Sequence, residues 1–483
     1  MTTPDPDPTL PYQVLPLEPA PEPPPEPRRH DPYASLRNVN YRRYFTGNAC
    51  ATFGIQMAGV TVAWELYAKT NSAFALGLVG FVQIVPIVGF ALIAGHIVDR
   101  FNRRNLILLC TFLLMVSYFL LGLSSHFAGS LPTTGIIGVL NTGLTGFARL
   151  LGDHHPNFTN AHVPIMLLLL FFNGCVRAVN QPAKYSIVPM LVNADELPNA
   201  ITWNSSMFET CNMVGPAVAG GAMAILLGKS FDSPWAYAGI YWFTAFCQLV
   251  QFVNVARIHI THPERKREPA TLKTMLVGVR FVYQNKIILS TITLDLFAVL
   301  LGGATALLPV FAKDILHVGP LGLGILRAAP SVGAITMSVM LAHAPPMKNA
   351  GRNMLVGVAG FGIATIVFGL SRNFTLSVVA LALTGAFDAI SVIVRHSLVQ
   401  ILTPDEMRGR VSAVNSVFIS TSNELGEFES GLTAQWGKNL LGPILGPMVA
   451  VAAGGVGTVV VVGIVCVLWP QVRKVKELSN PHG

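Results

Sequence analysis

The stretch GVTVAWELYAKTNSAFALGLVGFVQIVPIVG at residues 59–89 returns in diverged form as GATALLPVFAKDILHVGPLGLGILRAAPSVG at residues 303–333. Eight residues are identical at a constant shift of 244 positions, among them Gly80, which matches Gly324. A conserved spacing over this length indicates that the second stretch is a copy of the first. We therefore predict that the chain is built from two copies of one structural unit.

A smaller shift aligns the later parts of the two copies. Gly174 matches Gly385 at a shift of 211 positions. The first copy must therefore carry 33 extra residues, which lie between about residues 125 and 160.

The composition places the chain in a membrane. Apolar residues make up 52% of the 483 residues and charged residues only 12%, which is too few to cover the surface of a soluble protein. Twelve apolar segments have roughly the 20 residues that cross a bilayer. They are residues 44–67, 76–97, 105–124, 163–182, 202–227, 236–257, 287–311, 321–342, 354–371, 375–396, 411–436 and 441–469.

These segments predict an all-α membrane protein with twelve transmembrane helices in two pseudo-symmetric six-helix bundles. Two parallel repeats that face one another in a membrane are typical of a transporter that rocks around a central site.

The basic residues give the orientation. If the N-terminus is cytoplasmic, the external loops contain only six of the 32 Lys and Arg residues, as the positive-inside rule requires. These six are Lys69, Arg149, Lys229, Lys313, Arg372 and Lys438. We expect a multi-pass protein of the bacterial cytoplasmic (inner) membrane with both termini in the cytoplasm. The net charge of +8 does not indicate nucleic-acid binding, because the basic groups lie between apolar spans.

The predicted domain organisation has six parts. They are a disordered Pro-rich cytoplasmic tail (1–35), an N-terminal six-helix bundle (36–258) with an external insertion (125–160), a cytoplasmic linker with an amphipathic helix (259–286), a C-terminal six-helix bundle (287–470) and a cytoplasmic tail (471–483). Gly and Pro interrupt the apolar part of the insertion, so we predict a loop with a short interfacial helix there. The six cysteines lie in apolar runs without paired spacing, which argues against disulfides.

A charged motif joins the second and third spans. It consists of Gly95, Asp99, Arg100, Arg103 and Arg104. Charge alone would describe an ordinary positive-inside loop, but the spacing resembles the G-x-x-x-D-R-x-G-R-R signature of the major facilitator superfamily, with Asn in place of the second Gly. By that resemblance the Asp belongs to an inward gate and pairs with the start of the eleventh span when the transporter faces outward, and the last two Arg residues contribute to the same latch.

A second motif lies in the fifth span. Gly215, Pro216, Gly220 and Gly221 resemble the G-P-x-x-G-G pattern of antiporter branches of that superfamily, and physically they predict a kink with tight helix contact. The stretches VAWELYAKTNSAFALGLVGF, QPAKYSIVPMLV, NVNYRRYF and LGILRAAPSVGA are similar to the branch that includes the enterobactin exporter and the transmembrane secretion effector proteins. The resemblance covers about residues 36–470.

Ionisable residues within the spans are the candidates for proton coupling or substrate binding. A charge at mid-bilayer costs about 2.5–3.5 kcal/mol, so each one needs a partner, water or a proton. The candidates are Arg177, Glu209, Asp295, Arg327, Asp388, Glu424 and Glu427, with Glu429 nearby.

Glu424 and Glu427 lie on one helical face because they are three residues apart. Two neighbouring carboxylates oppose each other's ionisation, which suits a site that carries protons. The alternative is that one of them is a helix-packing residue bonded to Asn423 or Ser422.

Arg177 and Asp388 occupy equivalent positions in the two repeats, so we expect both to face the central cleft without requiring that they touch. Arg327 either binds an anionic substrate or neutralises a neighbouring carboxylate. Glu209 and Asp295 either couple protons or reach interfacial water.

Further polar residues lie at the outer ends of the spans and in the external insertion. Glu65, at the outer end of the first span, is predicted to be a solvated rim residue. The external Asp153, His154, His155 and His162 fit no zinc spacing, so no metal site is predicted.

The chain lacks a phosphate-binding loop and the motifs of common hydrolases. We therefore expect no enzyme activity and no cofactor, with a proton gradient as the energy source. The favoured hypothesis is proton-linked efflux, by alternating access, of a small molecule such as a drug-like compound, a metabolite or a siderophore. The alternatives are an importer or lipid flippase on the same scaffold, or a non-transporting membrane subunit. We expect a monomer whose partners are its substrate and membrane lipid.

Overall fold

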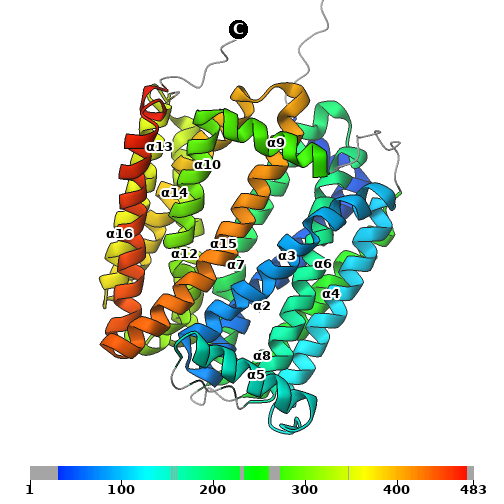
Figure 1. Cartoon of the computed structure of the whole chain (residues 1–483). Coiled ribbons are helices and arrows are strands. Elements are labelled where there is room, and N and C mark those ends of the chain that lie inside the picture. Colours follow the sequence, from blue (N-terminus) through cyan, green and yellow to red (C-terminus); the bar gives the residue numbers. More distant parts are fainter. Residues whose placement is uncertain are drawn as a thin grey trace, which may run out of the picture.

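The computed structural model describes residues 31–153, 156, 158, 160–228, 233–259, 272–345 and 347–475, and within these ranges every regular element is a helix (Figure 1). The N-terminal tail up to residue 30, the basic part of the linker and the last eight residues lie outside the described residues. The predicted all-helical fold is confirmed.

Six long helices come from each half of the chain. The first half contains α2 (Val39–Thr70), α3 (Ala73–Arg100), α4 (Arg103–His126), α6 (His162–Leu191), α7 (Leu197–Leu227) and α8 (Pro234–Ala256). The second half contains α10 (Lys286–Leu301), α12 (Gly319–His343), α13 (Ala350–Leu370), α14 (Phe374–Leu402), α15 (Asp405–Leu441) and α16 (Leu445–Leu468).

Short helices connect them. They are α1 (Ala34–Arg37), α5 (Ile136–Leu150), α9 (Leu272–Gln284) and α11 (Leu308–Val310), with the 3₁₀ turns η1 (Ala194–Glu196), η2 (Ala304–Leu307) and η4 (Val472–Lys474) and the π-helical turn η3 (Phe311–Ile315). Helix α5 lies in the predicted insertion, and α9 lies where the linker was predicted to form an amphipathic helix.

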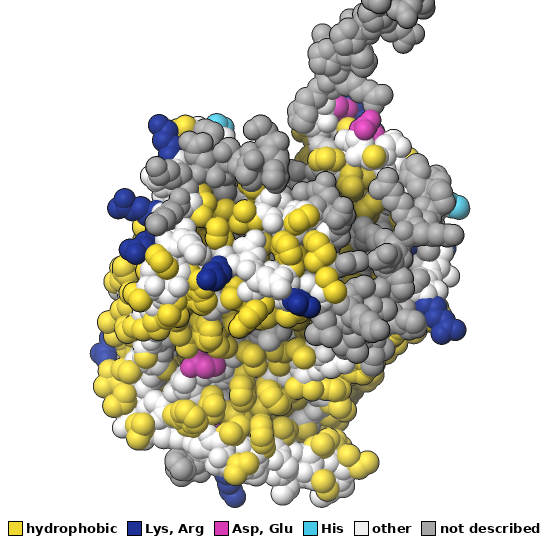
Figure 2. Space-filling model, turned by 45° about the horizontal axis from the view of Figure 1, so that its top comes forward, with side chains coloured by type: hydrophobic (Ala, Val, Ile, Leu, Met, Phe, Trp, Pro, Cys, Tyr) yellow, Lys and Arg dark blue, Asp and Glu magenta, His cyan; other side chains and the backbone are white. Residues whose placement is uncertain are grey.

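Ten helical segments of the described chain are long and apolar enough to cross a membrane. Helices α2 and α15 are not among these ten, because polar and charged residues lower their mean hydropathy. Their 32 and 37 residues still correspond to about 48 and 55 Å of helix, which exceeds the thickness of a bilayer core. Hydrophobic side chains cover most of the described surface seen in Figure 2.

The seventh span is broken, whereas a continuous helix was predicted over 287–311. Helix α10 ends at Leu301, and two glycines follow. A Cβ atom on Gly302 would lie 2.5 Å from the ring of Phe361, and one on Gly303 would lie 2.8 Å from the carbonyl oxygen of Gly426. Close packing against α13 and α15 therefore requires glycine here, and glycine favours a helix end.

The two halves repeat the same internal contact. In the first half Gly174 of α6 packs against Pro86 of α3, and in the second half Gly385 of α14 packs against Pro330 of α12. These four residues are the ones that the shifts of 244 and 211 pair. The repeat in the sequence is therefore a repeat in the packing.

The halves meet through a second pseudo-symmetric pair of contacts. We call the end of the molecule with α9 the inner end and the end with α5 the outer end. Near the outer end, Gly220 of α7 packs on Gly324 of α12, and Gly431 of α15 packs on Gly77 of α3. Helices α3 and α15 cross in the lower part of Figure 1 and diverge toward α9.

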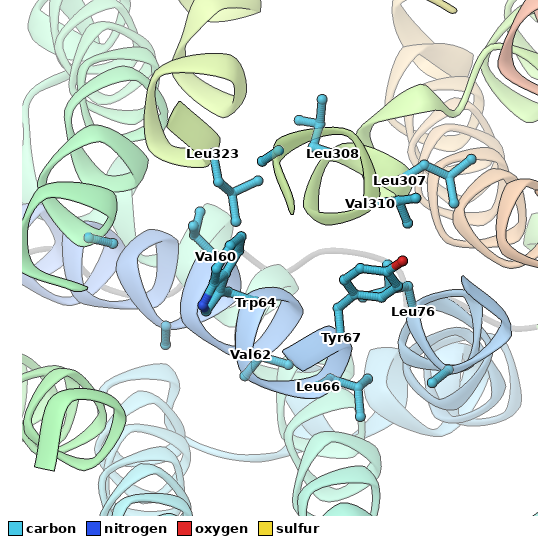
Figure 3. Packing of buried hydrophobic residues seen from close by; sticks show 14 of the residues in the cluster. Val60, Val62, Trp64, Leu66, Tyr67, Leu76, Leu307, Leu308, Val310 and Leu323 are labelled. Atoms are coloured by element: carbon cyan, nitrogen blue, oxygen red, sulfur yellow. The ribbon is translucent and has the colours of Figure 1, made fainter. Parts of the chain in front are cut away.

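An apolar cluster closes the outer side. Trp64 and Tyr67 of α2 are almost fully buried, and they lie beside Leu307, Leu308 and Leu323 from the second half (Figure 3).

Polar contacts between the halves surround this cluster. The Tyr67 hydroxyl donates a hydrogen bond to the Asp314 carboxylate, and Lys438 Nζ donates to the Asn71 carbonyl oxygen at 2.8 Å. On the inner half of α3, by contrast, a Cβ on Gly89 would meet nothing within 4 Å. The two halves are therefore in close contact near the outer end, and α3 and α15 diverge toward the inner end (Figure 1).

Replacing Gly324 by Val is expected to destabilise the protein by about 1–3 kcal/mol. A Cβ there would lie 2.6 Å from the Pro216 carbonyl oxygen and 3.0 Å from Gly220 Cα, and backbone atoms cannot move aside without separating the helices. Thermal unfolding in detergent measures the effect. Gly59→Val is the matched control, because a Cβ on Gly59 meets nothing within 4 Å. Equal unfolding midpoints for the two variants would contradict the prediction.

Candidate functional site

The centre of the interface between the halves holds a charged pair from opposite halves. Arg177 on α6 has its Nη1 3.8 Å from Oε1 of Glu424 on α15, and the same Nη1 donates a 2.6 Å hydrogen bond to Gln83 of α3. The Arg177 side chain is 36% exposed and that of Glu424 is 13% exposed. The guanidinium is thus partly exposed while it contacts both halves.

A second pair lies one helical turn further along α15. Glu427 Oε1 is 3.9 Å from Arg327 Nη2 of α12, within the same half. Arg327 also donates to the Thr305 carbonyl oxygen at 3.2 Å. Both pairs are longer than the 2.7–2.9 Å typical of a charge-assisted hydrogen bond. The two arginines therefore retain donor capacity for a ligand.

Glycines position these groups. Gly174, Gly324 and Gly80 each stand three residues before Arg177, Arg327 and Gln83, on the same helical face. A Cβ on Gly80 would collide with the carbonyl oxygen of Glu424. Close helix approach at each glycine brings the polar side chain one turn later near the neighbouring helix, which belongs to the other half at Gly80 and Gly324 and to the same half at Gly174.

Glu424 and Glu427 therefore lie on one face of α15, and each carboxylate is paired with a different arginine. Ser422 donates to the Ile419 carbonyl of its own helix, so it does not bond to either carboxylate. Glu429 makes no ion pair among the described residues and lies one and a half turns from Glu424.

Asp295 lies in a buried ion pair with Arg395. The Asp295 side chain on α10 is paired with Arg395 Nη1 on α14, and the two residues are 8% and 3% exposed. Arg395, at the end of the apolar segment 375–396, was not among the candidate residues predicted within the spans. In the structure α14 continues to Leu402, so this arginine lies inside the bundle.

Asp388 lies apart from Arg177. It lines a cavity of about 10 Å³ together with Asp295 and Ser391, a volume close to that of a single water-sized probe. Glu209 of α7, which is half-buried, is near enough for its charge to act on Asp388 across the interface. The acids predicted within the spans thus form two groups: one at Arg177 and Arg327, and one on the inner side of them.

Lys184 is a further residue that sequence reasoning missed. Its Nζ donates a 2.8 Å hydrogen bond to Asn48 of α2. The sequence repeat could have revealed this residue, because Lys184 aligns with Arg395 at the shift of 211, so that both repeats carry a cation at the same position. In each half a cation on the fourth long helix therefore reaches a polar side chain on the first.

Glu65 is not a solvated rim residue, and that prediction is wrong. Its side chain is fully buried among four polar groups of the first half. It accepts hydrogen bonds from Lys69 Nζ at 2.6 Å, Ser125 Oγ at 2.5 Å and the Tyr241 hydroxyl at 2.8 Å, and His162 Nε2 lies 3.3 Å away. Helix packing surrounds the carboxylate because α4, α6 and α8 all end beside it.

The charged motif between α3 and α4 is described only in part. Gly95 and Asp99 belong to α3, but the burial and side-chain contacts of these two positions are not among the described features. Arg104 donates to the carbonyl oxygens of Val255 and Ala256 at the end of α8, where cations stabilise the helix dipole. Arg103 is buried, with Nη1 3.7 Å from the Met190 sulfur.

The motif of α7 packs on two helices. A Cβ on Gly215 would lie 2.8 Å from Gln56 Cβ of α2, and Gly220 faces α12. Gly221 is less constrained, with only Leu321 at 4.0 Å. Pro216 contributes its carbonyl oxygen to the contact with Gly324.

Comparison with known proteins identifies the family. The sequence profile described as Major Facilitator Superfamily matches residues 44–426. The chain belongs to the major facilitator superfamily. Among its relatives, an enterobactin exporter of Citrobacter koseri is 24% identical over 442 residues, which cover 90% of this chain and 93% of that protein.

Solved structures of other members share the fold. A bacterial homologue of the iron transporter ferroportin in an inward-facing state has a TM-score of 0.58 at 14% identity and covers 88% of this chain and 99% of its own. The inward-open xylose transporter of Escherichia coli has a TM-score of 0.58 at 14% identity, with coverage of 94% and 99%. The family and fold are those of a multi-pass secondary transporter rather than an enzyme.

Proposed function

We propose that this major facilitator exports a small molecule across the bacterial cytoplasmic membrane in exchange for protons, with both termini in the cytoplasm. The observation that carries the proposal is the contact between Glu424 and Arg177, because it joins the two halves within the membrane-spanning region and both side chains are partly exposed. The enterobactin exporter that resembles the chain supports a substrate of siderophore, metabolite or drug-like character.

Protonation of Glu424 is the coupling step in this proposal. A neutral carboxyl attracts the Arg177 guanidinium less than a carboxylate does, so proton occupancy changes the free energy of the contact between the halves. Substrate that binds the carboxylates competes with the proton for the same groups. Competition of this kind produces exchange, since each ligand favours release of the other.

Transport in everted vesicles and in proteoliposomes tests the proposal. Enterobactin and ethidium serve as probes, one a siderophore and one a drug-like cation. The lumen of an everted vesicle corresponds to the outside of the cell. We expect a proton gradient that is acidic inside the vesicle to drive accumulation of a probe in the lumen, because protons leave as the probe enters, and we expect collapse of the gradient to stop it. Accumulation in the opposite direction would favour an importer, and movement of labelled phospholipid alone would favour a flippase.

A further inference from the structure

The external insertion ends in residues that hold the second half of the protein. The Leu151 carbonyl oxygen accepts a 2.6 Å hydrogen bond from Trp436 Nε1, and the Gly152 carbonyl oxygen accepts one from Asn439 Nδ2. Both donors are on the outer end of α15. The insertion itself belongs to the first half, between α4 and α6.

Asp153 makes the third contact. It is only 2% exposed. Its Oδ2 accepts a 2.8 Å hydrogen bond from Ser72 Oγ, and its Oδ1 accepts a 3.1 Å hydrogen bond from Gln435 Nε2. Ser72 caps the start of α3, where its Oγ accepts from the Ala75 amide. One buried carboxylate therefore joins α3 of the first half to α15 of the second.

The backbone conformation at Gly152 permits the close approach of Trp436. Gly152 has φ +96°, and a Cβ there would lie 2.7 Å from Trp436 Nε1, so only glycine fits. Helix α5 is anchored to the first half: Ala148 is fully buried, and the ring of Phe147 is 6.1 Å from that of Phe74 on α3.

These contacts are specific to one conformation. The insertion moves with the first half because α4, α6 and the contacts with α3 hold it. Opening of the outer side requires the outer ends of α3 and α15 to separate, which breaks all three contacts to α15. The second repeat has no matching insertion, since the shift between the repeats falls by 33 residues across this region.

We propose that Leu151, Gly152 and Asp153 form an outer latch that biases the transporter toward its inward-facing state, with Asp153 as the positioning residue. The contacts stabilise the inward-facing state and are absent from the outward-open state. They therefore shift the population toward the inward-facing state. The inference requires only that the two halves tilt; it does not depend on the substrate or on proton coupling.

Hydrogen exchange of the full-length purified protein, followed by mass spectrometry, tests the latch without substrate or pH gradient. In Asp153→Ala and in Gln435→Ala we expect faster exchange at the start of α3 and at the outer end of α15. The ratio of outward-open to inward-facing molecules should rise about tenfold, which corresponds to about 1.4 kcal/mol. Thr142→Ala is the matched control in the same insertion, because among the described residues the Thr142 hydroxyl donates to the Gly138 carbonyl oxygen of its own helix and to no residue of the second half.

A reciprocal exchange of side chains separates the latch from general loss of structure. In Asp153→Asn combined with Gln435→Glu, the new amide donates to the new carboxylate and still accepts from Ser72. We expect this double variant to recover the slow exchange of the wild type, while α4 and α8 exchange equally in every variant. Unchanged exchange at the outer ends in the single variants, or no recovery in the double variant, would overturn the proposal.

Discussion

Glu424→Gln is expected to uncouple transport from the pH gradient while the protein still folds. Glutamine keeps the size of the side chain but cannot bind or release a proton, so the contact with Arg177 no longer depends on proton occupancy. Coupling free energies between sites are typically 1–3 kcal/mol, so the stimulation of transport by an imposed gradient should fall by a factor of about 5 to 150. The measurement is probe uptake by proteoliposomes with and without the gradient.

Two residues on the same helix are matched controls for this prediction. Glu429→Gln makes the same chemical change at a carboxylate without an arginine partner among the described residues, and it should behave like the wild type. Glu427→Gln removes a contact within one half, so we expect a change in apparent substrate affinity with coupling retained. Gradient-driven uptake that persists in Glu424→Gln would refute the assignment of the proton to this carboxylate.

Asp295→Leu is expected to lower the free energy of unfolding by about 3–5 kcal/mol, because it leaves the Arg395 guanidinium buried without its counter-charge. Arg395 is only 3% exposed, so water cannot replace the lost carboxylate. Replacing both residues, as Asp295→Leu with Arg395→Met, should recover most of the loss, since an apolar pair of similar volume carries no charge to bury. Thermal and denaturant unfolding in detergent measure these differences.

The equivalent position of the first half provides the comparison. Lys184→Met removes a cation that pairs with the neutral Asn48, so no charge is left uncompensated. The expected loss is that of one hydrogen bond to a charged group, about 1.5–3 kcal/mol. If Asp295→Leu costs no more than Lys184→Met, the ion pair does not have the structural role that we infer. A double variant that folds and still shows gradient-driven transport would exclude Asp295 as the proton carrier.

The positions of the acids in the chain were evident before the structure, but their partners were not. The spacing of Glu424 and Glu427 predicts one helical face, and the structure places both side chains there. Nothing in that spacing shows that Arg177 contacts one of them and Arg327 the other, because the two arginines are far away in the sequence and reach α15 only in the folded bundle.

Errors arose where a residue stands at the end of an apolar segment. Hydropathy assigns such a residue to the rim, which is how Glu65 was predicted to be solvated, and Arg395 was not among the candidates within the spans. Whether the end of a helix is exposed to solvent depends on the helices that pack around it. Glu65 is buried because the ends of three other helices surround it, and Arg395 because α14 continues past the apolar run.

The sequence by itself determined the membrane environment, the two repeats, the extents of most of the helices and the family, because apolar run length and residue spacing are properties of the chain taken locally. Three features became known only from the packing of the helices: the end at which the two halves meet, the arginine that each carboxylate contacts, and the hydrogen bonds between the insertion and α15. Those features depend on contacts between helices that are distant in sequence. Such contacts result from the close approach of whole helix faces, which no local pattern specifies.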